Sequence, residues 1–240
     1  MLKEAVILVG GKGTRLQSVV SDRPKPVAVV LGRPFVEWLI LALRAQGVRH
    51  IVLSVGYMSE QIQNIIGNGR RLDVKITYAV DPFPLGTGGA LRRALDCIKG
   101  ERFLALNGDS YCPFQVQRLL DEHLEHRALV TLWLTRSTES ARYGSVDVDA
   151  NGAVLNFREK STGQHSDLIN AGIYLIERKV LEVITLDIAF SAEKELFPSL
   201  IGIGLYAVVG SGPFLDIGTP ESYKIASTAL VEEFGKFHLH

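Results

Sequence analysis

Apolar residues fall into two patterns along the chain, short continuous runs and longer stretches with helical spacing. In the first half, four short runs predict buried strands, at 5–9, 50–55, 74–80 and 102–106. Between these runs, apolar positions spaced by three or four residues predict helices, at 34–46, 58–66 and 86–98. Strands and helices that alternate in this way predict a parallel sheet with helices on both of its faces.

The alternation changes in the second half. A helix is expected at 114–126 and a strand at 128–134, after which short apolar runs follow one another without long helices between them. These runs predict strands at 143–148, 154–157, 168–176 and 205–209. Ser191 is a typical N-cap for a helix from residue 192, and Thr219 with Pro220 for a last helix that reaches about residue 234. We therefore expect one α/β domain over 1–240, with a β-rich insertion at about 135–215.

Composition narrows the classes of partner. The 26 Lys and Arg residues balance the 26 Asp and Glu residues, so charge gives no reason to expect nucleic acid or an anionic membrane. The two cysteines have neither metal nor redox spacing. No apolar stretch reaches the ~18 residues of a membrane span, and the first residues lack the basic region and cleavage site of a signal peptide. These features predict a cytoplasmic protein.

A glycine-rich loop follows the first predicted strand. It reads Gly10-Gly11-Lys12-Gly13-Thr14-Arg15, and its glycines leave backbone N–H groups open to a phosphate. Arg15 adds a planar cation that suits phosphate oxygens. The spacing is neither that of a P-loop nor that of a dinucleotide-binding fingerprint. An acid about 20 residues later at a strand end is also missing, so a nicotinamide-dependent oxidoreductase is disfavoured. A turn without a ligand remains the alternative.

Two further segments are candidates for ligand binding. Pro24 and Pro26 restrict the backbone on both sides of Lys25, which is typical of a placed cation, with an exposed loop lysine as the alternative. Residues 85–90 read Leu-Gly-Thr-Gly-Gly-Ala and begin a helix with small side chains. Such a helix start lets a flat or anionic ligand approach closely, and it equally permits close packing of the helix against the sheet.

Two acidic residues are expected at strand ends. Asp109 follows the strand at 102–106, at the edge where open α/β sheets bind ligands. Asp216 stands at the end of a short apolar segment late in the chain. Asp109 is therefore a candidate Mg²⁺ ligand, although Asn-Gly-Asp is also an ordinary turn sequence.

In order and spacing, these features resemble the sugar-1-phosphate nucleotidyltransferase family. The matching segments are Gly-Gly-x-Gly-Thr-Arg-Leu at 10–16, Pro-Lys-Pro at 24–26, Leu-Gly-Thr-Gly-Gly at 85–89, Asn-Gly-Asp at 107–109, Glu-Lys at 159–160, Asn-Ala-Gly at 170–172 and Asp-Ile-Gly-Thr-Pro at 216–220. Within the family, the segments most similar to D-glycero-α-D-manno-heptose 1-phosphate guanylyltransferases are 19–26, 53–57, 142–146, 168–174 and 190–195. The resemblance covers essentially the whole chain.

The resemblance implies a Rossmann-like, mixed and mainly parallel α/β sheet flanked by helices, which is the GT-A-like fold of nucleotidyltransferases. Residues 1–134 would form the nucleotide-binding half, and 135–240 the β-rich sugar-phosphate-binding half with the C-terminal helix. The implied reaction transfers GMP from GTP to a sugar 1-phosphate, with D-glycero-α-D-manno-heptose 1-phosphate as the expected sugar, and releases pyrophosphate. Direct attack on the α-phosphorus requires positioning and cations rather than a nucleophilic side chain.

The resemblance also implies roles for individual residues. The implied catalytic residues are Arg15, Lys25, Asp109, Lys160 and Asp216, with Asp109 and Asp216 binding Mg²⁺. The implied nucleotide-binding residues are Gly10, Gly11, Gly13, Thr14, Arg15, Lys25, Asp81, Pro84, Gly86, Thr87 and Asp109. The implied sugar-binding residues are Gly144, Glu159, Lys160, Asn170, Ala171 and Gly172. Asp81 is expected to accept from guanine N1–H and the N2 amino group, although it could also accept from uracil N3–H.

Other substrates and one other class of protein stay open. The substrate alternatives are mannose 1-phosphate with GTP and an N-acetylated hexosamine-type 1-phosphate with UTP. A catalytically silent nucleotide-sugar-binding regulator is disfavoured because every expected charged position is filled. We expect a monomer or small homo-oligomer that supplies nucleotide sugars for capsule or surface polysaccharide.

Overall fold

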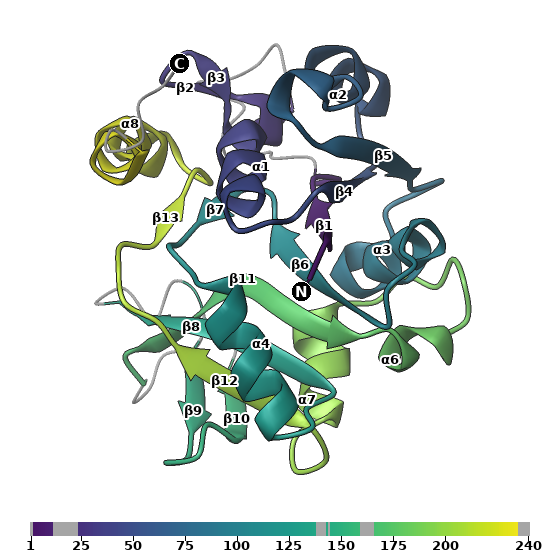
Figure 1. Ribbon diagram of the computed structural model, residues 1–240, viewed down its shortest axis with the longest axis vertical. Helices are drawn as coiled ribbons and strands as arrows, with labels where there is room; N and C mark the ends of the chain where they lie inside the picture. Colours follow the sequence, from purple (N-terminus) through teal and green to yellow (C-terminus); the bar gives the residue numbers. More distant parts are fainter. Residues whose placement is uncertain (1, 12–23, 138–142, 144, 159–165, 235–240) are drawn as a thin grey trace.

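The computed structural model describes residues 2–11, 24–137, 143, 145–158 and 166–234. Its centre is a nine-stranded sheet that runs through the whole molecule (Figure 1). Its strands are β1 (Glu4–Leu8), β4 (His50–Val55), β5 (Lys75–Val80), β6 (Arg102–Asn107), β8 (Val130–Arg136), β9 (Ser145–Val148), β10 (Val154–Arg158), β11 (Leu168–Glu177) and β12 (Leu205–Val209). The helices are α1 (Phe35–Ala45), α2 (Ser59–Ile66), α3 (Gly86–Ala94), α4 (Val116–Glu125), α6 (Lys179–Glu182), α7 (Phe197–Ser199) and α8 (Pro220–Phe234).

The first half of the sheet is parallel, as the sequence pattern predicts. β1 pairs in parallel with β4 on one side and β6 on the other, and β4 pairs in parallel with β5. The chain therefore moves outward from β1 to β5 and then returns to the far side of β1. This reversal of strand order between β1 and β6 is the place where open α/β sheets form a ligand crevice.

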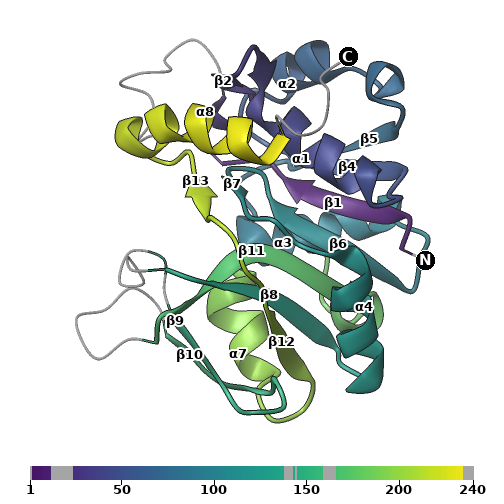
Figure 2. The ribbon, with the colours of Figure 1, turned by 60° about the vertical axis from the view of Figure 1, so that its left-hand side comes forward.

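The second half continues the same sheet with a change of direction. β11 runs antiparallel to β6 and to β8, and β12 adds in parallel to β8. The residues expected to form a β-rich insertion thus mostly extend the central sheet. β9 and β10 branch from the start of β11 as an antiparallel pair, which projects from the rest in Figure 2.

Two apolar cores lie on opposite faces of the sheet, because successive side chains of a strand alternate between faces. On one face α1, α2, α4 and α8 pack against Ile7, Ile51 and Leu104. On the other face α3, α6 and α7 pack against Val6, Val52 and Phe103. Helices on both faces were predicted, and this arrangement confirms them.

Several short elements lie around the sheet, and the sequence predicts some of them: a strand that ends at Asp216, and helical structure at residues 95–97 and from residue 192. β2 (Val29–Val30) and β3 (Arg33–Pro34) form a small hairpin, and β7 (Ser110–Tyr111) pairs with β13 (Leu215–Asp216). Single turns of 3₁₀ helix occur at η1 (Lys25–Val27), η2 (Arg70–Leu72) and η3 (Leu95–Cys97), and a π-helical turn, η4 (Ala192–Leu196), precedes α7. Pro34 was expected to begin a helix, but it is extended (φ −52°, ψ 136°) and caps α1, because it is still paired in the hairpin.

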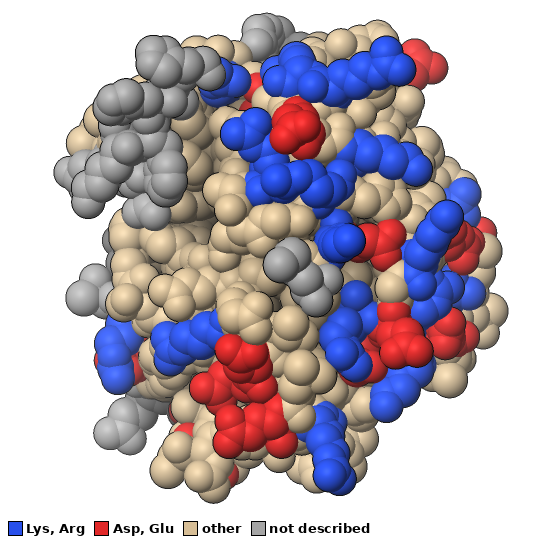
Figure 3. Space-filling model, viewed as in Figure 1, with Lys and Arg blue, Asp and Glu red and all other residues tan. Residues whose placement is uncertain are grey.

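Charge is unevenly distributed on the face shown in Figure 3. Lys and Arg side chains gather over the part that carries α1, α2 and β5, and acidic side chains gather over α4. The equal numbers of acidic and basic residues therefore do not produce an even surface. Within the described part of the chain, no helix is both long enough and apolar enough to cross a membrane.

Candidate functional site

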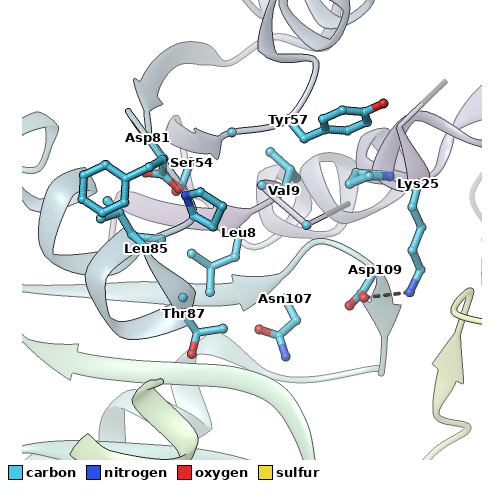
Figure 4. A pocket seen from close by; sticks show the side chains of 18 of the residues that line it. Leu8, Val9, Lys25, Ser54, Tyr57, Asp81, Leu85, Thr87, Asn107 and Asp109 are labelled. Atoms are coloured by element: carbon cyan, nitrogen blue, oxygen red, sulfur yellow. Dashed lines mark hydrogen bonds and ion pairs between the residues drawn. The ribbon is translucent and has the colours of Figure 1, made fainter. Parts of the chain in front are cut away.

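A pocket of about 770 Å³ opens at the carboxyl ends of the parallel strands. It contains the last residues of β1 and β6, the second-last residue of β4 and the first residue after β5: Leu8, Asn107, Ser54 and Asp81 (Figure 4). The remaining lining comes from the loops that follow these strands, from the start of α3, and from Lys25, Pro26 and Gly218. Its location is the crevice that the reversal of strand order predicts.

The loops that enter the pocket are held by hydrogen bonds that extend the sheet. Val9 N donates to Ser54 O (2.9 Å), Asp81 N to Val55 O (2.8 Å), and Gly108 N to Leu8 O (2.9 Å). A side chain at Gly10 would place its Cβ 3.3 Å from Gly56 N, whereas the Cβ position at Gly11 is open. Gly10 thus allows two loops to meet, and Gly11 leaves free space at the pocket wall.

The glycines at the start of α3 serve packing as well as the pocket. A Cβ at Gly88 would lie 2.0 Å from the ring of Phe190, and one at Gly89 would lie 2.4 Å from Ile188 O. Gly86 lines the pocket, has φ +69°, and would place a Cβ 2.4 Å from Phe190 O. These glycines therefore permit close packing, but against residues 188–190 and not against the sheet as predicted from the sequence. Gly86 packs on the same segment and also lines the pocket.

Asp81 places an acceptor without a partner in the pocket. Its Oδ1 is buried and has no hydrogen-bond partner among the described residues. Burial raises the pKa of Asp81 to about 6; Arg93 opposes this rise and Asp187 adds to it. Ser54, which is 1% exposed, also has a buried hydroxyl without a partner in the described structure. Because an unpaired buried polar atom is costly, these two groups point to a ligand that supplies hydrogen bonds.

The opposite end of the pocket carries an ion cluster. Lys25 Nζ lies 2.7 Å from Asp109 Oδ2 and 3.5 Å from Asp216 Oδ1, and the lysine is only 9% exposed. Pro24 is extended and caps η1, in which Lys25 is the first residue. The prediction of a placed cation between two prolines is confirmed.

Asp109 and Asp216 are brought together by the pairing of β7 with β13. In that register Asp216 lies opposite Ser110, and Ile217 N donates to Asp109 O (3.0 Å). Asp216 Oδ1 also accepts from Gly218 N at 2.6 Å. Two acids far apart in the chain therefore reach the same ammonium group.

The donor set of this cluster fits Mg²⁺. The ion takes oxygen ligands and is commonly held by one or two carboxylates together with water and substrate phosphates. Asp109 and Asp216 supply two carboxylates that converge on one cationic group. Three or more His, Cys, Asp or Glu side chains do not gather into a metal-binding group anywhere in the described residues. Asp109 and Asp216 could therefore hold Mg²⁺ only together with water or substrate oxygens.

The predicted sugar-binding segment lies beside Asn107. β11 has a register shift between Asn170 and Ile173, and Gly172 within it has φ +72°. A Cβ at Gly172 would lie 2.7 Å from Asn107 Nδ2, so only glycine fits there without displacing that side chain. Asn170 Oδ1 accepts from Gly172 N at 3.0 Å. The shift, called the β11 bulge below (residues 170–172), thus faces the end of β6.

A family model for nucleotidyl transferases matches residues 4–233. The chain belongs to the nucleotidyl transferase family. It is 36% identical over 229 residues to the D-glycero-alpha-D-manno-heptose 1-phosphate guanylyltransferase of Aneurinibacillus thermoaerophilus, an alignment that covers 95% of this chain and 98% of that one. It is 36% identical over 231 residues to the mannose-1-phosphate guanylyltransferase of Mycobacterium tuberculosis, covering 95% of this chain but 64% of that relative. The crystal structure of HddC from Yersinia pseudotuberculosis complexed with GMP-PN is similar with a TM-score of 0.84 and 34% identity, covering 95% of this chain and 100% of that one.

These comparisons confirm the family and the fold class expected from the sequence. The structure of this nucleotidyl transferase also shows which of the predicted site residues meet. The predicted residues that line the pocket are Gly10, Gly11, Lys25, Asp81, Pro84, Gly86, Thr87 and Asp109. Asp216 joins them through Lys25. The predicted residues Gly13, Thr14, Arg15, Gly144, Glu159 and Lys160 lie outside the described residues, so their roles remain predictions.

Several pocket residues were missed from the sequence. Ser54 is the second-last residue of β4, Gly56 and Tyr57 follow that strand, and Asn107 ends β6. The rule that ligands bind at the carboxyl ends of parallel strands points to these residues as it does to Asp109. Asn170, which is predicted to bind the sugar, donates one of its two amide N–H groups to the Tyr174 hydroxyl at 2.9 Å. Its role toward the sugar remains a prediction.

Proposed function

We propose that this protein transfers GMP from GTP to D-glycero-α-D-manno-heptose 1-phosphate and releases pyrophosphate. The observation that carries the proposal is the polarity of the pocket. One end holds the unpaired carboxylate of Asp81, and the other holds the cluster of Lys25, Asp109 and Asp216. A nucleoside triphosphate has the matching polarity, with N–H donors on its base and an anionic, metal-binding chain of phosphates.

The base is assigned to the Asp81 end. Guanine presents N1–H and an N2 amino group on one edge, and a carboxylate can accept from both. Tyr57 and Phe83 line the same pocket with about half of their surfaces exposed (47% and 48%), which leaves aromatic faces available for a flat ring. The similar HddC protein forms a complex with GMP-PN, and this supports a guanine nucleotide as the ligand.

The α-phosphate is assigned to the Lys25 end. Attack by the sugar phosphate brings two anions together, so a fixed cation that neutralises the α-phosphate lowers the barrier without any covalent intermediate. Lys25 meets this need because the η1 turn holds it and its side chain is almost fully buried. Asp109 and Asp216 would hold Mg²⁺, which supplies further charge neutralisation at the phosphates when bound. Lys25 pairs with these two carboxylates in the structure. With Mg²⁺ on the carboxylates, its ammonium group would be released to the α-phosphate, while the η1 turn keeps its backbone in place.

The sugar phosphate is assigned to the neighbouring β11 bulge. Gly172 lies against the side chain of Asn107, which borders the pocket. We assign Glu159 to the sugar hydroxyls, Lys160 to the sugar phosphate, Gly144 to the space for the ring, and Arg15 to the β- and γ-phosphates, as the sequence predicts. Lys160 and Arg15 would partly neutralise the negative charge of the sugar phosphate and of the β- and γ-phosphates.

The heptose substrate has one specific competitor, mannose 1-phosphate. A mannose-1-phosphate guanylyltransferase and a heptose 1-phosphate guanylyltransferase are each 36% identical to this chain. We favour the heptose because the alignment covers 98% of the heptose 1-phosphate enzyme but only 64% of the mannose 1-phosphate enzyme. We further propose that the reaction takes place in the cytoplasm and supplies a nucleotide sugar for capsule or surface polysaccharide.

Pyrophosphate release from a matrix of substrates tests the proposal. GTP, ATP, UTP and thymidine triphosphate are each combined with the 1-phosphates of the heptose, mannose, glucose and N-acetylglucosamine, with Mg²⁺ present. The proposal predicts the highest kcat/KM for GTP with heptose 1-phosphate. A preference for mannose 1-phosphate with GTP would replace the sugar assignment, and a preference for UTP or thymidine triphosphate would overturn the base assignment.

A further inference from the structure

The Glu193 carboxylate is hydrogen-bonded by hydroxyl groups from three separate parts of the chain. Thr87 Oγ1 on α3 and Ser191 Oγ (3.0 Å) donate to Glu193 Oε2, and the Tyr174 hydroxyl on β11 donates to Oε1 at 3.3 Å. Glu193 itself stands in η4, just after the loop that packs on α3. One carboxylate therefore ties together α3, β11 and the 188–193 segment.

These bonds do more than cap η4. The sequence predicts that Ser191 caps a helix from residue 192, and the structure confirms this cap: Lys194 N donates to Ser191 Oγ (3.2 Å), and Ser191 N donates to Glu195 Oε1 (2.9 Å). Glu193 is thus directed at α3 and β11 instead of at its own helix end.

Tyr174 connects Glu193 to side chains near the pocket. Its side chain is fully buried, and burial followed by the nearby charge of Glu193 raises the pKa of the Tyr174 hydroxyl well above its usual value. The hydroxyl therefore stays protonated and donates a hydrogen bond to Glu193. On its other side it accepts from Asn170 Nδ2 at 2.9 Å, and the side chains of Asn170 and Asn107 partly oppose the rise of its pKa.

The two asparagines are the groups that shape the boundary between the two assigned substrates. Asn170 Oδ1 holds the N–H of Gly172 in the β11 bulge, and Asn107 fills the space that Gly172 leaves beside it. Asn107 is also part of the pocket wall. A change in the position of the Tyr174 hydroxyl would therefore shift the bulge relative to the pocket.

We propose that Glu193, acting through Tyr174, is a positioning residue that fixes the β11 bulge against the nucleotide pocket so that the sugar phosphate meets the α-phosphate. The inference rests on the proposed function, because it assigns the bulge to the sugar phosphate. The nucleotide site depends less on this carboxylate, since Thr87 Oγ1 also accepts from Ala192 N at 2.9 Å. Losing the Glu193 contact should therefore affect the sugar substrate more than GTP.

Two conservative variants test the proposal. Glu193→Gln removes one acceptor oxygen and the charge, and Tyr174→Phe removes only the hydroxyl from a buried ring. Each should lower kcat/KM for the sugar 1-phosphate about tenfold or more, mainly through KM, because a displaced bulge would bind the sugar phosphate less tightly in both the ground state and the transition state. Calorimetric titration should give a Kd for GTP within about twofold of wild type. Glu195→Gln, in the same turn but with its carboxylate bonded to Ser191 N, is the matched control and should keep wild-type kinetics.

A double-mutant cycle separates positioning from a general loss of structure. If Glu193 acts through Tyr174, the double variant should be no worse than the poorer single variant in kcat/KM for the sugar phosphate. Additive losses, equal losses for GTP and sugar phosphate, or a lowered Tm with wild-type kinetics would each overturn the proposal. If Glu193→Gln does not fold, Tyr174→Phe is measured alone. Its KM for the sugar 1-phosphate and its Kd for GTP are then compared with those of the wild type. A wild-type enzyme that uses no sugar 1-phosphate would instead refute the proposed function itself.

Discussion

Replacing Asp81 by Asn exchanges one acceptor of the buried carboxylate for an amide donor. Asp81 Oδ1 has no partner in the described structure, so the change breaks no hydrogen bond of that oxygen in the free protein. In the complex it would oppose an N–H₂ group to the N–H donors of guanine. A buried donor left without an acceptor costs about 1–3 kcal/mol, which corresponds to roughly 5- to 150-fold in affinity. GTP should bind more weakly by this factor, while ATP, which offers an acceptor at N1, should gain relative to GTP.

The same substitution should stabilise the free protein in a pH-dependent way. Burial raises the pKa of Asp81 from its ordinary value of 3.8 to about 6. Between these two values the folded protein keeps a proton that the unfolded chain has lost, so wild-type stability falls as pH rises through this window. Above pH 6 the full cost of the buried charge is present. Asp81→Asn should therefore raise Tm at pH 7.5 and leave it nearly unchanged close to pH 4.

Calorimetric titration of GTP, ATP and UTP, with thermal melts at the two pH values, measures both effects. The expected combination is a more stable protein that has lost its preference for GTP. Unchanged GTP preference would show that the base is bound elsewhere, and a lower Tm at pH 7.5 would show that Asp81 is already compensated inside the protein. An unchanged preference together with a higher Tm would leave the burial argument intact but refute the base assignment.

Two other substitutions test neighbouring features. Lys25→Met removes the ammonium group between Asp109 and Asp216, so the protein without nucleotide should bind Mn²⁺ more tightly by electron paramagnetic resonance; adding Asp216→Asn should abolish the gain. Unchanged Mn²⁺ affinity would mean that the two carboxylates do not form one metal site. Gly88→Ala places a methyl group against Phe190 and should lower the free energy of unfolding by roughly 1–3 kcal/mol in urea. Wild-type stability of that variant would contradict the packing role of this glycine.

Long elements of the fold follow from the sequence because each has a strong local pattern. The strands at His50–Val55 and Leu205–Val209 have the predicted bounds, since each is an apolar run closed by polar or glycine residues. The sequence predicts the strand end at Asp216, where β13 lies, but β7 could not be predicted, because two residues show no periodicity. Their pairing depends on residues more than a hundred positions apart. Yet it is this pairing that brings Asp216 to Asp109.

The residues of the candidate site also differ in whether a local sequence signal predicts them. Lys25 carries a local signal, its two flanking prolines, and it proves to be buried and paired. The contact between Tyr174 and Glu193 has none, because a tyrosine in an apolar strand and a glutamate in a helix start are each explained by their local surroundings. Their meeting is set by how the 188–193 segment packs across α3. Sequence motifs thus identified groups that carry charge, whereas the groups that position them needed the three-dimensional structure.

The central claim is that the α-phosphate of GTP passes to a sugar phosphate while the β- and γ-phosphates leave together. GTP labelled at either the α- or the γ-phosphorus, incubated with the wild-type protein, Mg²⁺ and heptose 1-phosphate, tests this directly. The account predicts that the α label appears in a GDP-sugar resistant to phosphatase and the γ label in pyrophosphate. A γ label in inorganic phosphate, or an α label that stays in GDP or GMP in the presence of the sugar phosphate, would contradict it.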